Sequence, residues 1–208
     1  MALLFTRDRG NQLEVMTGPL SSSKLRLVRP SLARLPGYVE ALRQGWSPNT
    51  TRDVRNEELA AIADDAAAFL RRLRGEEAGT VRLAAGDEVP RLPGVVRWMW
   101  DGEFCGAINL RYQPDTEELP PHVSGHVGYA VVPWKRSRGY ATLALALLLP
   151  LARDAGLERV LLTCDDDNVA SRRVIEANGG IGDGDEMNAD RSEVRKLRFW
   201  LSTAPRAP

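Results

Sequence analysis

One stretch of the sequence, residues 126–178, constrains the fold more than any other. Its first seven residues, HVGYAVV, are mostly β-branched or aromatic residues typical of a strand, and Pro133 ends that strand. An almost continuous run of Ala and Leu from Ala141 to Ala152 indicates a helix, which Gly156 ends, and RVLLTC at 159–164 is a second buried strand. Two strands joined through a helix form a parallel crossover unit, so we expect a domain built around this β–α–β segment.

The turn between the first strand and the helix is a candidate anion site. It contains Lys135, Arg136 and Arg138, and Gly139 lies at the entry to the helix. The first N–H groups of a helix have no intrahelical partner and the macrodipole is positive there, so this end favours a phosphate. A glycine here lets a ligand approach the backbone closely. The alternative is an ordinary helix start with solvated charges, and the turn alone does not separate the two.

Two motifs in this segment resemble those of the GCN5-related N-acetyltransferases, the GNAT family. RSRGYA at 136–141, after a GYAVVP-type strand, resembles the family's diphosphate-binding motif, Gln/Arg-x-x-Gly-x-Gly/Ala. NVASRRVIEANGG at 168–180 is similar to the family's second signature, roughly N-x-A-S-x-x-L-Y-E-K-x-G-F. Two motifs in the right order and about thirty residues apart are more specific than either alone. The resemblance covers residues 24–202, closely from His126 onward.

The resemblance implies an α+β fold. The sheet would be mixed, mostly antiparallel and twisted, with about seven strands flanked by about four helices. Its two central parallel strands would splay apart to admit a cofactor. The sequence pattern agrees, with VVRWMW, an Asp-Gly turn and EFCGAINLRY as the clearest hairpin. The other predicted elements are strands at Lys24–Arg29, within Gly179–Asp185 and at Val194–Leu201, helices at Ser31–Gln44 and Glu57–Leu73, and loops at Val89–Pro93 and Gln113–Gly125.

Length and composition favour one globular domain. Residues 24–208 suffice for a single domain with a sizeable core, and residues 1–23, with weak periodicity and a Gly-Pro break, are predicted to be a loosely structured N-terminal arm. The net charge is zero, which suggests neither a nucleic-acid surface nor a membrane patch. Cys105 and Cys164 lie in apolar strand contexts and lack the partners of a metal site, so we expect reduced, buried thiols. Met1–Phe5 is too short for a signal-peptide core, which predicts a cytoplasmic protein.

On this resemblance, acetyl-CoA is the expected co-substrate and no metal is required. Its diphosphate would contact the turn, and its pantetheine arm would pair with the open edge of the strand that carries Val131 and Val132. Asn168 would come near the pantetheine or the attacking amine, although a helix N-cap worth ~1 kcal/mol explains this residue type equally well. The residues expected to contact the cofactor are Val131, Val132, Arg136, Ser137, Arg138, Gly139, Tyr140, Ala141, Thr142, Asn168 and Ser171.

Catalysis in this family proceeds by direct attack of an amine on the thioester. His126 occupies a position where the family often has a carboxylate, which makes it a candidate general base; the alternative is a hydrogen-bonded core or rim histidine. Glu103 and Asp101 at the hairpin are weaker alternatives for the base. The signature departs at Ile175, where the family often has a tyrosine that protonates the thiolate, and at Gly180, in place of an aromatic residue. Water, Tyr140 or Tyr129 would then supply this proton, or the thiolate would leave unaided. We name Tyr140 as the candidate acid.

The acceptor is expected to be a primary amine of a small molecule, an amino acid or a peptide. Candidate acceptor residues are Trp46, Glu103 and His122, and the alternative for Trp46 is a core anchor between two helices. The acidic loop at 115–118 weakly suggests a cationic acceptor. A homodimer through the last strands is a further expectation. Two other functions stay open: transfer from a bulkier acyl-CoA, and a non-catalytic acyl-CoA-binding or sensing module, which Ile175 keeps in question.

Overall fold

The computed structural model describes residues 25–77, 79–82, 86–186 and 195–205. The predicted N-terminal arm, residues 1–23, lies outside the described residues. The helices are η2 (Leu32–Arg34), α1 (Leu35–Arg43), α2 (Arg55–Leu73), η3 (Pro133–Lys135), α3 (Tyr140–Asp154) and α4 (Val169–Ala177). The strands are β1 (Arg26–Val28), β2 (Thr80–Arg82), β3 (Glu88–Pro90), β4 (Gly94–Trp100), β5 (Phe104–Arg111), β6 (Val127–Val131), β7 (Arg159–Asp165), β8 (Ile181–Glu186) and β9 (Lys196–Ser202).

The strands form two main sheets and a separate two-stranded pair. One sheet has the order β1-β4-β5-β6, the other β7-β9-β8, and β2 pairs with β3. Every pairing within these sheets is antiparallel. The β6–α3–β7 crossover joins the two main sheets, and such a connection joins parallel strands. The predicted α+β fold with a mixed, mostly antiparallel sheet is therefore confirmed.

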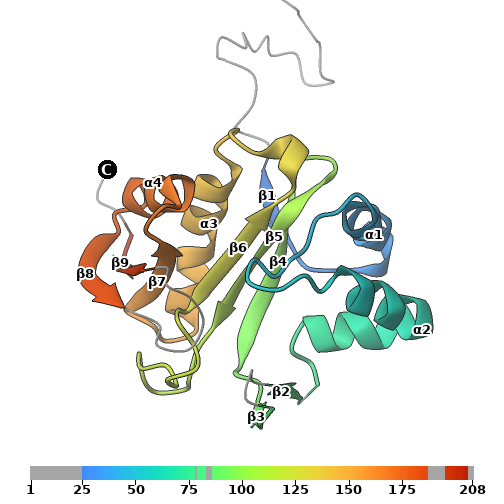
Figure 1. Cartoon of the computed structure of the whole chain (residues 1–208), viewed down its shortest axis with the longest axis horizontal. Helices are drawn as coiled ribbons and strands as arrows, with labels where there is room; N and C mark the ends of the chain where they lie inside the picture. The colour runs from blue at the N-terminus through green and yellow to red at the C-terminus, as the bar shows by residue number, and fades with distance from the viewer. Residues whose placement is uncertain (1–24, 78, 83–85, 187–194, 206–208) are drawn as a thin grey trace, which may run out of the picture.

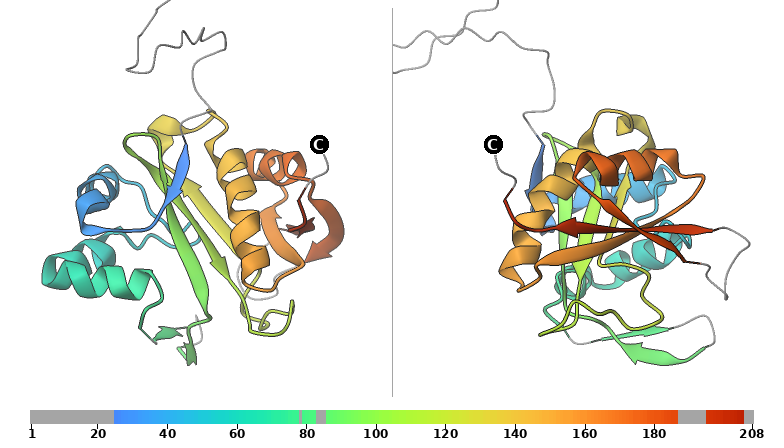
Figure 2. Two further views of the ribbon diagram at one scale, coloured as in Figure 1. Left: turned by 180° about the vertical axis from the view of Figure 1, so that it is seen from behind. Right: turned by 90° about the vertical axis from the view of Figure 1, so that its left-hand side faces the viewer.

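Strands β6 and β7 meet at one end and then diverge. At that end, the backbone N–H of His126 donates to the carbonyl of Leu161 at 2.8 Å, and the N–H of Leu161 donates to Nδ1 of His126 at 2.9 Å. Further along β6, the hydroxyl of Tyr129 instead reaches Oγ of Ser171 in α4, at 2.7 Å. The two strands belong to different sheets, and they lie apart in Figure 1 and, seen from behind, in the left view of Figure 2. The carboxyl half of β6 thus has a strand neighbour on one edge only.

Helices cover both faces of the four-stranded sheet. Helices α1 and α2 lie on one face, and α3 and α4 lie on the side of the second sheet (Figure 1). The core between the sheet and α3 contains fully buried aliphatic side chains, among them Ile108, Leu145 and Leu162. The core under α1 and α2 is aromatic: the ring of Tyr38 stacks on that of Trp98 with centroids 5.0 Å apart. The four-stranded sheet thus lies between two cores, one on each face.

The first half of the chain contains a strand pair, β2–β3, that was not predicted. Val89–Pro93 was predicted as a loop, but Glu88–Pro90 forms β3 and pairs with β2. This prediction was wrong because a proline is tolerated on an edge strand, where its missing N–H removes no essential ladder bond. The predicted helix at 57–73 is α2, which contains a non-helical residue, Asp65, with φ −149° and ψ 98°. Its carboxylate accepts the N–H groups of Ala67 and Ala68 and so caps the second half of the helix.

Among the described residues, none of the helices has the length and apolar character needed to cross a membrane. The described part of the chain also contains no group of three His, Cys, Asp or Glu residues placed to hold a metal ion.

Candidate active site

The turn that leads into α3 is open and its helix start is uncapped by any side chain. Ser137 has φ 59° and Gly139, the N-cap of α3, has φ 75°, so the chain passes through two left-handed residues before the helix begins. No side chain accepts a hydrogen bond at this N-cap. A Cβ added to Gly139 would meet no other atom within 4 Å. Unpaired amides, a positive dipole end and empty space in front of them are what a diphosphate group requires.

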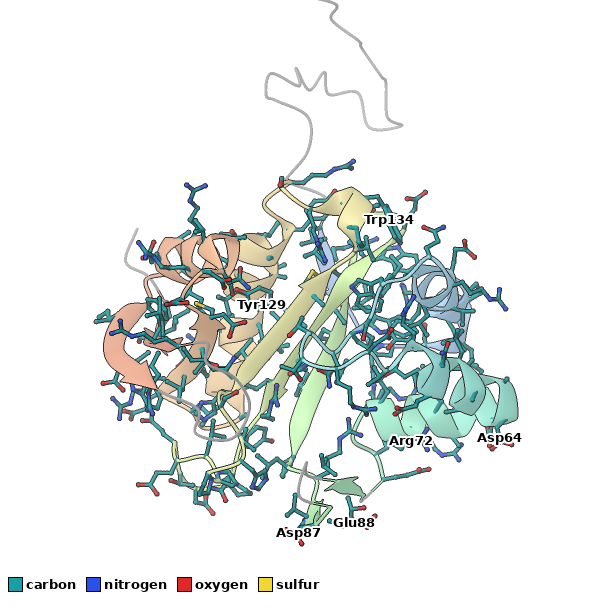
Figure 3. All side chains as sticks on the ribbon, viewed as in Figure 1. Asp64, Arg72, Asp87, Glu88, Tyr129 and Trp134 are labelled. Atoms are coloured by element: carbon teal, nitrogen blue, oxygen red, sulfur yellow. The ribbon has the colours of Figure 1, made fainter. Side chains whose placement is uncertain are left out.

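The two arginines of the turn are exposed and pair only with backbone. Nε of Arg136 donates to the carbonyl of Val131 at 3.3 Å, and Nη2 of Arg138 donates to the carbonyl of Trp134 at 3.2 Å. Neither guanidinium has a carboxylate partner among the described residues. Trp134 exposes 42% of its surface at the same end of the molecule (Figure 3). Two cations are therefore available to an anionic ligand.

Lys135, the third cation of the turn, has a different partner. Its ammonium donates to both carboxylate oxygens of Asp101, at 2.7 and 2.9 Å, and its side chain is only 8% exposed. Glu103 lies 3.2 Å from the same ammonium and is itself largely exposed. The sequence pattern grouped Lys135 with the two arginines as a candidate anion ligand. In the structure, the carboxylate of Asp101 neutralises the charge of Lys135 instead.

Asp101 also accepts a hydrogen bond from the hydroxyl of Tyr140, at 2.6 Å. Burial opposes ionisation of Asp101, but the hydrogen bonds from Lys135 and Tyr140 outweigh it and hold its pKa well below the usual range. The same hydrogen bond to Asp101 raises the pKa of Tyr140. Lys135 precedes the exposed residues 136–139 and Tyr140 follows them. The carboxylate of Asp101, in the β4–β5 turn, thus holds both ends of residues 136–139, the candidate anion loop.

The free edge of β6 is set by its pairing with β5. The carbonyl of His126 accepts from Arg111, and the N–H of Val132 donates to Cys105, so the even-numbered residues of β6 bond to β5. In an antiparallel ladder the alternate residues point their backbone groups the other way. The backbone groups of Tyr129 and Val131 therefore face the side where β6 and β7 diverge. Val132 itself is fully buried in the core under α1 and α2.

The start of α4 lies across this divergence. Asn168 is the N-cap of α4, and its side chain accepts the N–H of Ser171 at 3.0 Å, so the predicted cap is present. Tyr129, labelled in Figure 3, places its hydroxyl 2.7 Å from Oγ of Ser171, and burial raises the pKa of Tyr129 to about 12. Tyr129 therefore stays protonated in the neutral range.

The two departures from the family signature occupy packed positions. Ile175 is fully buried in the core, and a Cβ added to Gly180 would lie 2.4 Å from Cγ2 of Ile175. A larger residue at 180 is incompatible with Ile175 in this place, so the two departures depend on each other.

His126 is held between β6 and β7 by its own hydrogen bonds. It is fully buried, Nδ1 accepts from the N–H of Leu161, and Nε2 has no partner in the described part of the protein. Burial lowers its pKa to about 4, with Glu117 raising it and Arg111 lowering it to smaller extents. Since Nδ1 is an acceptor, the proton of the neutral ring is on Nε2, and neither nitrogen offers a free lone pair. This geometry gives His126 a bridging position between the strands.

The remaining acceptor candidates are placed as follows. Trp46 is buried in the aromatic core, edge-on to the rings of Tyr38 and Phe104, which is the core-anchor alternative. His122 is exposed in the loop between β5 and β6. Glu103 touches Lys135, as described. Asn109 and Arg111 of β5 were not singled out from the sequence, because their approach to β6 depends on strand register.

The comparisons with known proteins identify the family. A family model described as an acetyltransferase (GNAT) domain matches residues 25–181. A search of curated protein sequences finds no match. Since the family model covers well over half of the sequence, the chain belongs to the GNAT acetyltransferases.

Solved structures with low sequence identity share the fold. RimJ of Mycobacterium smegmatis, in complex with CoA-disulfide, has a TM-score of 0.58 at 19% identity, over 86% of this chain and 81% of that one. The Salmonella typhimurium acetyltransferase that modifies the N-terminal serine of ribosomal protein L7/L12 has a TM-score of 0.58 at 14% identity, over 87% and 96%. YncA, a putative acetyltransferase of Salmonella typhimurium with acetyl-CoA, has a TM-score of 0.53 at 15% identity, over 89% and 97%.

The chain is thus a GNAT acetyltransferase with acetyl-CoA as its co-substrate. The described residues fit that molecule: the helix start at Gly139 is open, two arginines beside it lack carboxylate partners, and the adjoining strand has a free edge.

Proposed function

We propose that this protein transfers an acetyl group from acetyl-CoA to a primary amine of a small molecule, an amino acid or a peptide, by direct attack in a ternary complex. The observation that supports this most strongly is the open, uncapped start of α3 at Gly139, beside Arg136 and Arg138. It lies where β6 ends, next to the divergence of β6 and β7, so a diphosphate and an extended arm can be held by adjoining features.

The binding residues follow from this geometry. The amides of residues 138–141 and the side chains of Arg136, Ser137 and Arg138 hold the diphosphate, with Thr142 in the first turn of the helix. The edge of β6 at Tyr129 and Val131 has no strand partner among the described residues and pairs with the pantetheine amides as another strand would, with the exposed Arg136 moving from the carbonyl of Val131 to the diphosphate. Asn168 and Ser171 bound the opposite side, at the start of α4.

Bound acetyl-CoA supplies a thioester that is activated toward amines. The domain itself orients the amine and protonates the departing sulfur. Tyr129 is the residue we assign to the last step, because it is protonated, lies on β6 and points toward α4. Tyr140 we assign a positioning role, because its hydroxyl proton is bonded to Asp101. His126 holds β6 against β7, and we propose that the amine loses its proton to water.

A matched pair of glycine variants tests the cofactor site. Gly139→Val places a side chain in the space in front of the helix start, and Gly156→Val is the control, because Gly156 is also left-handed at φ 88° with no atom within 4 Å of an added Cβ. Both variants bear the same backbone strain of about 1–2 kcal/mol. We expect Gly139→Val to weaken CoA binding by more than about tenfold in calorimetry, a loss of ~1.4 kcal/mol, and Gly156→Val to bind as the unaltered protein does.

Thiol release from acetyl-CoA with a panel of amines then tests the reaction. Binding of CoA without thiol release above background for any amine would instead support a non-catalytic acyl-CoA-binding module. Equal CoA affinity in both glycine variants would contradict the proposed site.

A further inference from the structure

Arg111, at the end of β5, carries a half-buried charge without an anionic partner. Its Nη2 donates to Oδ1 of Asn109 at 3.3 Å, and a Cβ added to Gly128 would lie 3.1 Å from the same nitrogen. The guanidinium therefore lies over Gly128 of β6. No carboxylate among the described residues comes within ion-pair distance of it.

The charges around Arg111 do not compensate it. Burial lowers the pKa of Arg111, and Arg91 lowers it further because it is a second positive charge. Glu58 interacts with Arg91 and receives the hydroxyl of Tyr38, and Glu117 is bonded to Arg159 at 2.6 Å. Placing an uncompensated guanidinium out of water is unfavourable, which implies that an anion completes the site when a ligand binds.

The position of Arg111 relates it to the proposed reaction. Gly128 lies four residues before Val132, so at ~3.3 Å per residue it is roughly 13 Å along the strand from the point where β6 leads into η3. An arm that extends from the turn along Val131 is directed toward Gly128. Arg111 and Asn109 share the face of the sheet that packs under α1 and α2, because they alternate with Ile108 and Leu110 of the opposite core. In the proposed complex, this position over Gly128 is toward the end of the arm that carries the thioester, where the acceptor amine has to meet it.

We propose that Arg111, together with Asn109, binds a carboxylate of the acceptor, so that the acceptor is an amine bearing a carboxylate, such as an amino acid or an acidic peptide. The inference rests on the proposed function. A guanidinium binds a carboxylate through two parallel hydrogen bonds, and the absence of a side chain at Gly128 lets the guanidinium of Arg111 and the amide of Asn109 lie directly over β6. Glu117, in the acidic loop that suggested a cationic acceptor, is engaged by Arg159, so that surface is partly neutralised.

The test compares amino acids with their own carboxamides, which keep the amine and lose the carboxylate. Each pair is measured with unaltered protein, with Arg111→Gln and Arg111→Lys, and with Arg97→Gln as control. Arg97 is a half-buried arginine of the neighbouring strand whose pKa is also lowered by burial. It alternates with Trp98 and so lies on the other face of the sheet.

Two readouts are used: binding of each ligand to the CoA-loaded protein by calorimetry, and KM against kcat for acetyl transfer. We expect Arg111→Gln to reduce the preference for acid over amide by roughly 10- to 100-fold, through binding and KM. Arg111→Lys should keep an intermediate preference, because it retains the charge but not the planar fork. Arg97→Gln should leave the preference unchanged.

The outcomes separate this inference from the proposed function. CoA affinity of Arg111→Gln equal to that of the unaltered protein shows that the variant is folded and its cofactor site intact. The proposed carboxylate site at Arg111 is contradicted if no acid in the panel binds or reacts better than its amide, or if the preference for the acid persists in Arg111→Gln. Either result leaves the proposals of CoA binding and amine acetylation intact. Loss of CoA binding in the unaltered protein would instead overturn the proposed function itself.

Discussion

Asp101 bonds to the residues on both sides of the candidate anion loop, residues 136–139. Removing its carboxylate should therefore lower both the stability of the fold and the affinity of the loop for CoA. Asp101→Ala deletes the acceptor of two hydrogen bonds from Lys135 and one from Tyr140. It leaves an ammonium whose side chain is 8% exposed without its main counter-charge. Breaking a buried ion pair on one side costs about 3–5 kcal/mol. Glu103 remains 3.2 Å from the ammonium, so we expect a loss of about 2–4 kcal/mol in the free energy of unfolding.

The assays are urea unfolding and calorimetric titration of CoA. A domain stable by about 5–15 kcal/mol still folds after this loss, so CoA affinity can be measured on the variant. That affinity should fall by about tenfold, because residues 136–139 lose their anchor on both sides. Asp183→Ala, which removes an exposed carboxylate bonded to Trp200, is the control and should cost under about 1 kcal/mol without changing CoA affinity.

The pH dependence and a double variant sharpen the test. The pKa of Asp101 is lowered in the fold, so its stabilisation is complete above the unfolded value of about 3.9 and disappears as the pH falls through the lower folded value. The difference between the unaltered protein and Asp101→Ala should therefore be constant near neutrality and shrink only below about pH 4. Asp101→Ala with Lys135→Met should recover much of the stability, since no charge is left unpaired. Unchanged stability in Asp101→Ala, or reduced stability with unchanged CoA affinity, would refute the argument.

Four further predictions follow from the site. Burial lowers the pKa of His126 to about 4, so on acidification the unfolded chain binds a proton at higher pH than the folded protein does. The free energy of unfolding should therefore fall by up to about 3 kcal/mol as the pH drops from about 6.5 to 4. His126→Asn should reduce this pH dependence, measured by urea unfolding. Asn168→Ala removes the α4 cap and should cost about 1 kcal/mol by the same assay. Tyr129→Phe should lower kcat with little change in CoA affinity, and an unchanged kcat would exclude Tyr129 as the proton donor. Gly180→Phe should destabilise the fold through its clash with Ile175, and Ile175→Ala should relieve part of that loss in thermal unfolding.

The sequence predicts well where the determinants are local. The β6–α3–β7–α4 segment follows from consecutive apolar runs, Gly156 and the Asn168 cap, all of which act within a few residues of themselves. The pairing of Asp101 with Lys135 and Tyr140 joins residues more than thirty positions apart. Nothing in their spacing indicates it, because it depends on how the β4–β5 turn packs on η3. For that reason Lys135 and Tyr140 were grouped with the ligand-binding residues.

The positions of His126 and Arg111 also depend on contacts with distant residues, which the sequence pattern does not reveal. A histidine at the start of a strand is compatible with catalysis or with burial, and only the contact with Leu161 distinguishes them. Arg111 gains its place over Gly128 from the register of β5 with β6, which pairs Asn109 with Gly128. Register follows from both strands together, so a single strand pattern does not reveal it.

Because β6 diverges from β7, backbone hydrogen bonds join these two strands only near His126 and Leu161 in the part of the chain that the structure describes. In the proposed complex, the co-substrate lies between β6 and β7 and forms the hydrogen bonds that a strand would form there. Part of the hydrogen bonding that connects the two sheets then comes from the co-substrate. Binding of the co-substrate connects the two sheets, and its release removes that connection in each reaction cycle. The amides of Tyr129 and Val131 should accordingly exchange their hydrogens with solvent more slowly when CoA is bound than when it has left.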